Sequence, residues 1–67
     1  MNKGEKYQFM QGGGMLIRKG KDKSGNPIIK ARTKDKDWHI LNNCYVNEEH
    51  RDFAFQQFCM LPSIAED

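Results

Sequence analysis

The clearest helical segment of this chain lies near its C-terminal end, and it constrains the fold more than any other feature. Residues 48–61, EEHRDFAFQQFCML, contain no helix breaker. Asn47 is a good N-cap, the two glutamates that follow it suit the positive end of a helix dipole, and Pro62 ends the segment. The sequence therefore predicts one C-terminal helix over residues 48–61, against which the shorter segments before it must pack.

Short extended segments precede this helix and are separated by turn residues. Three glycines at residues 12–14 break the first two segments apart, and the loop at residues 20–26, rich in Asp, Asn and Gly, joins the next two as a hairpin. Alternation of side-chain type favours strands in these segments. The predicted strands are residues 7–11, 15–19, 27–33 and 38–41, with residues 44–46 as either a short further strand or the lead into the helix.

These elements predict a small α+β domain. An antiparallel sheet of three to four strands packs one face on the C-terminal helix, in the order ββββα or βββα. We expect a single domain over residues 7–61, a disordered polar start at residues 1–6 and a short tail at residues 62–67. A chain of 67 residues leaves room for only a small core.

The two halves of the chain carry opposite charge. Residues 1–36 contain ten basic and three acidic residues, whereas residues 37–67 contain one arginine and six acidic residues. The first half is therefore +7 and the second −5, which gives the net charge of +2. Such asymmetry suggests a basic surface for an anionic partner and a separate acidic surface.

Strand alternation sorts the basic side chains of residues 27–33. Ile29 and Ala31 suit the face that packs on the helix, whereas Lys30 and Arg32 lie on the opposite, outer face. A solvated, solubilising surface is an equally good reading of these cations, although such surfaces normally mix the two signs. The candidate binding residues for an anionic partner are Arg18, Lys19, Lys21, Lys23, Lys30, Arg32, Lys34 and Lys36.

Nucleic acid, either DNA or RNA, is the first candidate partner, because a basic sheet face and hairpin loop can neutralise several phosphates. The acidic helix would be repelled by DNA, so the sheet or its loops must make the contact. Tyr7, Phe9 and Trp38 offer stacking surfaces if they face outward, but we expect Trp38 to pack in the core. Over residues 15–61 the order of three strands and a helix, with one basic strand, resembles the small sheet-based DNA-binding domains of tyrosine recombinases and plant AP2 domains. This resemblance is one of element order, and no site residue is carried over from it.

The predicted helix also has apolar residues on its back. Ala54, Phe58 and Leu61 form a core stripe, whereas Phe53 and Met60 fall on nearly the opposite side. Either the N-terminal segment or Ile64 covers these two side chains, or they form a contact patch for a homodimer or another protein. The candidate interface residues are Phe53, Gln56, Gln57 and Met60. The alternative function is therefore a small inhibitor or adaptor, of the kind that phages and mobile elements encode, which binds an acidic protein surface or uses the helix patch.

No pattern of catalytic or metal-binding residues stands out. His39, Cys44, His50 and Cys59 lack the close pairs of ligands that structural zinc sites use, and no nucleophile has a specific partner base. We therefore expect no enzyme activity, no metal or other cofactor and no small-molecule substrate. With no signal peptide and no membrane span, we expect a cytoplasmic protein with free thiols.

Overall fold

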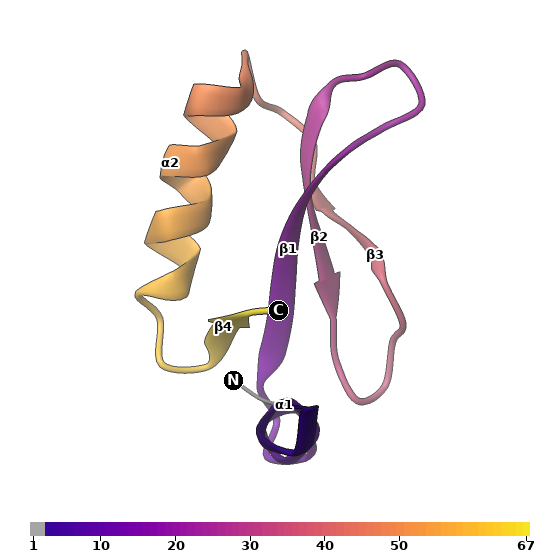
Figure 1. The fold of residues 1–67 in the computed structure, drawn as a ribbon, viewed down its shortest axis with the longest axis vertical. Helices are drawn as coiled ribbons and strands as arrows, with labels where there is room; N and C mark the ends of the chain where they lie inside the picture. Colours follow the sequence, from indigo (N-terminus) through magenta and orange to yellow (C-terminus); the bar gives the residue numbers. More distant parts are fainter. Residues whose placement is uncertain (1–2) are drawn as a thin grey trace.

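The computed structural model describes residues 3–67. Its four strands form one mixed sheet, with one helix before the first strand and one between the third and fourth strands (Figure 1). The strand order in the sheet is β3-β2-β1-β4. The elements are α1 (Lys3–Gln11), β1 (Met15–Lys21), β2 (Pro27–Arg32), β3 (His39–Asn42), α2 (Glu48–Cys59) and β4 (Ile64–Glu66). The predicted α+β fold with a sheet packed on a C-terminal helix is confirmed.

The central hairpin forms where the sequence predicts it. β1 and β2 pair antiparallel from Leu16↔Arg32 to Lys21↔Pro27. The loop between them is held by Asp22, whose Oδ1 accepts hydrogen bonds from the backbone N–H groups of Ser24 and Asn26, each at 2.9 Å. These bonds, that of Asn26 above all, lower the pKa of Asp22.

Helix α2 and the inner face of the sheet enclose the core. Asn47 caps the helix, because its side-chain oxygen accepts the backbone N–H of His50 at 2.8 Å. Phe55 of α2 packs against a buried cluster on the two central strands. That cluster is Ile17, Ile29 and Ala31, so the predicted inner face of β2 is confirmed.

The N-terminal part of the chain differs from the prediction. Helix α1 replaces both the disordered start, of which residues 1 and 2 lie outside the described part, and the strand expected at residues 7–11. The three glycines do not interrupt a strand; they end the helix. Gly13 has φ +91°, its N–H donates to Met10 O at 3.1 Å, and the N–H of Gly14 donates to Phe9 O at 3.0 Å. This pair of bonds is a Schellman C-cap, which requires the left-handed conformation that glycine adopts freely.

The fourth strand is also in a different place. Residues 44–46 are not a strand, and the expected tail contains β4 instead. β4 pairs parallel with β1, in the register Met15↔Ile64, so the sheet is mixed and not purely antiparallel. Figure 1 shows how the chain turns after α2 and returns along β1. Ile64 packs against the core, which explains why this short segment is ordered.

Candidate nucleic-acid interface

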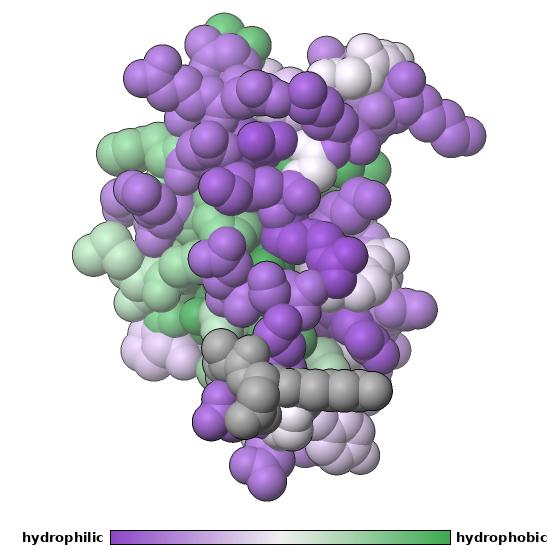
Figure 2. Space-filling view, viewed as in Figure 1, coloured by the Kyte–Doolittle hydropathy of each residue, from purple (hydrophilic) through white to green (hydrophobic). Residues whose placement is uncertain are grey.

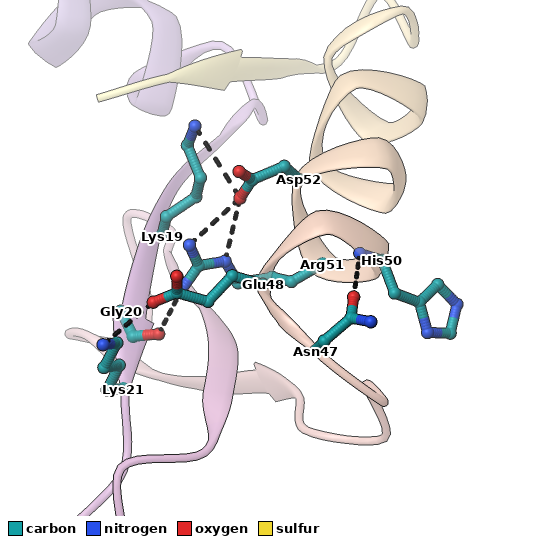
Figure 3. Close-up of polar contacts among 8 residues, drawn as sticks. All are labelled: Lys19, Gly20, Lys21, Asn47, Glu48, His50, Arg51 and Asp52. Atoms are coloured by element: carbon teal, nitrogen blue, oxygen red, sulfur yellow. Dashed lines mark hydrogen bonds and ion pairs between the residues drawn. The ribbon is translucent and has the colours of Figure 1, made fainter.

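The eight predicted cations do not share one face of the sheet. Lys19 and Lys21 lie on the same side of β1 as Ile17, so they point toward α2 (Figure 3). Lys19 Nζ lies 3.9 Å from Asp52 Oδ1, and Lys21 Nζ lies 2.9 Å from Glu48 Oε1. The ion pair with Lys21 lowers the pKa of Glu48. Both lysines are thus neutralised by acids of the helix and do not belong to the outer face.

Arg51 lies at the centre of this contact between strand and helix, and no feature of the sequence distinguishes it from a solvent-exposed helix residue. It is buried, and its Nη1 donates to the backbone carbonyl of Gly20 at 2.8 Å. Its Nε and Nη2 donate to Asp52 Oδ1 at 3.1 and 3.0 Å. Figure 3 shows the guanidinium between β1 and the first turns of α2. Because its donors are satisfied inside the protein, Arg51 holds α2 against β1 and is not available to a partner.

The outer face of the sheet carries Arg18, Lys30 and Arg32. Arg18 forms an ion pair with Asp67, and Arg32 Nε lies 3.6 Å from the exposed carboxylate of Asp37. Asp67 also accepts a hydrogen bond from Lys6 at 3.0 Å. The hydrogen bond from Lys6, with that from Arg18, lowers the pKa of Asp67.

Four lysines on or beside this outer face have no ion pair among residues 3–67. Lys30 is half-buried on β2, and Lys23 lies in the β1–β2 loop. Lys34 and Lys36 are exposed in the β2–β3 loop. That second loop is tightened by a hydrogen bond from Thr33 N to Lys36 O at 2.9 Å. We call these four residues the outer lysines: Lys23, Lys30, Lys34 and Lys36. Figure 2 shows hydrophilic side chains over much of the visible surface.

Trp38 lies outside the core, so the expectation that it packs there is wrong. It is half-buried just before β3, and the Arg18 guanidinium carbon lies 3.8 Å from the centre of its ring. Of the other two aromatic candidates, Tyr7 is exposed on α1 and the Phe9 ring lies against Gly14. Tyr7 lines a hollow with Arg32, and Trp38 lies nearer to the other end of the basic strands, beside Lys23 and Lys30.

An open groove of about 550 Å³ lies between the β1–β2 loop and β3. Trp38 forms part of one side, the buried Ile28 lies at its base, and two of the outer lysines border it. The lining residues are Lys21, Asp22, Lys23, Ser24, Ile28, Lys30, Trp38, His39 and Ile40. We refer to this feature as the Trp38 groove.

The predicted helix patch is uncovered. Phe53 is 63% exposed and Met60 76% exposed, and Gln56 and Gln57 are exposed beside them. Neither the N-terminal segment nor Ile64 covers the patch, because Ile64 packs in the core. Figure 2 shows apolar side chains gathered over α2 at the left of the view. Phe53 also lines a second hollow, of about 440 Å³, along the helix.

The cysteine and histidine side chains do not form a site. In the described part of the chain, no three His, Cys, Asp or Glu residues are close enough to hold a metal ion. Cys44 is exposed and Cys59 half-buried, and neither is in a disulfide. Burial raises the pKa of the Cys59 thiol, which disfavours its reactive thiolate. Within residues 3–67, neither helix is long and apolar enough to cross a membrane.

Comparison with known proteins finds no matching family model, no similar curated protein and no similar solved structure.

Proposed function

We propose that this protein is a non-catalytic module that binds nucleic acid through the outer face of its sheet. The observation that carries the proposal is that the lysines of the sheet and its loops fall into two groups, one in ion pairs with α2 and one without ion pairs in residues 3–67. Lys19 and Lys21 are neutralised by acids of α2, whereas the four outer lysines have no ion pair among the described residues. Lysines that are not in an ion pair can exchange condensed counterions for phosphates, which drives nucleic-acid binding.

The arrangement suits a phosphate backbone better than a purely solubilising surface. Solubilising surfaces alternate positive and negative side chains. Asp22 accepts hydrogen bonds from its own loop, and Asp67 is shared between Lys6 and Arg18, whereas Asp35 and Asp37 alternate with Lys34 and Lys36 in the β2–β3 loop. The positive charge most available to a ligand is therefore that of Lys23 and Lys30.

The test is a fluorescence-anisotropy titration with labelled single- and double-stranded DNA and RNA over a range of salt concentrations. If four lysines contact phosphates, the logarithm of the binding constant falls with the logarithm of the salt concentration with a slope of about −3. Absence of binding to every oligonucleotide at low salt would refute the proposed function.

A matched pair of variants assigns the binding to a face. Lys19 and Lys30 lie on adjacent strands and on opposite faces of the sheet. We expect Lys30→Gln to weaken binding and to reduce the salt slope by about 1. We expect Lys19→Gln, which removes the same charge from the helix side, to leave the slope unchanged. Equal effects of the two variants would show that net charge, and not this surface, determines the binding.

The second candidate is a small protein-binding inhibitor or adaptor. The exposure of Phe53 and Met60 favours it, because large apolar side chains grouped on one helix commonly mark a protein contact. The patch can bind either such a target or a second copy of the same chain, and we propose the second copy as its partner, in which case the basic face alone would contact a target. The two glutamines beside it are uncharged and can pair with their counterparts across a two-fold axis.

A further inference from the structure

We propose that the Trp38 groove receives an unpaired base, stacked on the indole, so that the nucleic acid bound by this protein is single-stranded. This inference rests on the proposed function and specifies its substrate class. The groove opens on the same face as the outer lysines, and Lys23 and Lys30 are part of its lining. Its volume of about 550 Å³ is within the range of small-ligand sites.

The groove contains more apolar surface than phosphate binding requires. Ile28 at its base is almost fully buried, so the exposed apolar surface comes from the half-buried Trp38 and from Ile40, which is 51% exposed at the margin. Phosphates alone would be bound by lysines on an open surface. An aromatic and aliphatic hollow bordered by ammonium groups instead matches a ligand that has a flat apolar ring and flanking negative charge. A nucleotide within a polymer has that chemistry.

The indole is held in place before any ligand arrives. The Arg18 guanidinium stacks on it at 3.8 Å, and Arg18 is itself paired with Asp67. Arg18 is not part of the groove lining, whereas Trp38 is. The guanidinium covers one face of the ring, so a base in the groove must stack on the other face, and the proposal requires that this second face is accessible from the groove. A stacking platform that is already ordered loses little conformational freedom on binding.

Lys30 is directed to the groove by its neighbour across the hairpin. A Cβ atom at Gly20 would lie 3.5 Å from Lys30 Cε and 3.8 Å from Lys30 Cδ. The aliphatic part of the Lys30 side chain therefore passes over Gly20, where no side chain blocks it. This aliphatic part then borders the groove beside Ile28. This places a cation next to the proposed base site, where the phosphate on one side of the base would lie.

Stacking inside the groove requires a base whose face is exposed. In a duplex each base face is covered by the next base pair, and proteins stack aromatic side chains on bases mainly in single strands, loops and ends. We therefore expect the groove to distinguish single strands from duplexes, while the outer lysines bind the phosphates of either.

The experiment uses Trp38 as its own reporter, because it is the only tryptophan in the chain. Tryptophan fluorescence and anisotropy are followed while a single-stranded oligonucleotide, its duplex and a 5′-mononucleotide are added separately. We expect the single strand to quench the fluorescence and to bind more tightly than the duplex. We expect Trp38→Ala to weaken single-strand binding about tenfold or more, with the salt slope unchanged.

Two further variants keep the test decisive. Trp38→Phe retains a stacking ring and should recover part of the lost affinity, which also covers the case in which Trp38→Ala fails to fold. Phe53→Ala removes an exposed aromatic side chain from α2, on the opposite side of the sheet from the groove, and should change nothing. Circular dichroism establishes that each variant is folded.

The possible failures are distinguishable. Salt-dependent binding with no quenching, or with equal affinity for single strand and duplex, would overturn the stacked base and leave the proposed function standing. Quenching by the mononucleotide at the same affinity as the oligonucleotide would make the groove a free-nucleotide site and would overturn the polymer ligand. No binding of any oligonucleotide would refute the proposed function and this inference together.

Discussion

At Gly14 the absence of a side chain is a packing requirement. A Cβ built at this position would lie 2.1 Å from Cε1 of the Phe9 ring, far inside van der Waals contact. The ring therefore fills the space that a side chain would need. Since Gly14 also donates the final hydrogen bond of the α1 cap to Phe9 O, one residue fixes both the end of the helix and the space that the Phe9 ring occupies.

We accordingly predict that Gly14→Ala destabilises the protein by about 1–3 kcal/mol, because the Phe9 ring must move to make room. The measurement is urea-induced unfolding followed by circular dichroism. Gly12→Ala is the matched control, since its Cβ would lie 3.5 Å from the nearest atom, an ordinary contact, and we expect a change of only about 0.5 kcal/mol. Similar destabilisation by both variants would mean that loss of glycine flexibility, and not the clash with Phe9, is responsible.

Single residues also show how far the sequence could predict the site. Alternation placed Lys30 and Arg32 on the outer face correctly, because β2 has buried neighbours at every second position. The same alternation applied to residues 15–19 puts Lys19 on the side of Ile17, away from Lys30. Lys21 lies in the segment predicted as a loop, for which alternation predicts no face. The burial of Arg51 could not be predicted, since it depends on the carbonyl of Gly20, which lies far away in the sequence.

At the scale of elements, Asp67 connects three segments. It follows β4, its side chain pairs with Lys6 of α1 and Arg18 of β1, and its backbone N–H donates to Ile17 O at 2.8 Å. The two cations lower the pKa of its carboxyl group. A carboxyl group whose pKa is lower in the folded state stabilises the fold above its ordinary pKa, and this stabilisation is lost as the pH falls through the folded pKa.

The expected consequence is a pH-dependent effect of Asp67→Asn. At neutral pH the variant should be less stable by about 1 kcal/mol, since its partly exposed pairs are lost. The difference from the wild-type protein should shrink as the pH falls below about 4, because the wild-type carboxyl group is then also neutralised. Urea unfolding at several pH values measures it. A constant difference at every pH would show that the variant acts through packing and not through the charge.

The elements differ in how well sequence could locate them. α2 carries its own boundaries in Asn47 and Pro62, and the structure places it at Glu48–Cys59. The alternation of Tyr7 and Phe9 with polar residues predicts a strand where the structure has α1. Gly13 can be recognised as a helix cap only if the residues before it are already taken to be helical. β4 has only three residues, too few for a pattern, and exists because it pairs with β1 and packs in the core.

At the scale of the whole molecule, two surfaces of different character lie on opposite sides of the sheet. The outer lysines and the Trp38 groove occupy one side, whereas α2 covers the other and presents Phe53 and Met60 to solvent. The ion pairs between β1 and α2 separate these surfaces by neutralising the cations in between. Because the surfaces do not overlap, we expect a partner on the helix patch to leave the proposed nucleic-acid surface unobstructed.

This separation leads to a prediction about assembly. We expect the wild-type chain to form a dimer at high concentration through the helix patch, and Phe53→Glu to keep it monomeric, since a charge would then be buried against its copy. Analytical ultracentrifugation over a range of concentrations measures this.

Val46→Glu is the control, because it adds the same charge at an apolar position that is 85% exposed and lies before α2. The Phe53 variant should retain the salt slope of nucleic-acid binding. A wild-type protein that is monomeric at every concentration would exclude the homodimer, and loss of nucleic-acid binding in Phe53→Glu would show that the two surfaces are not independent.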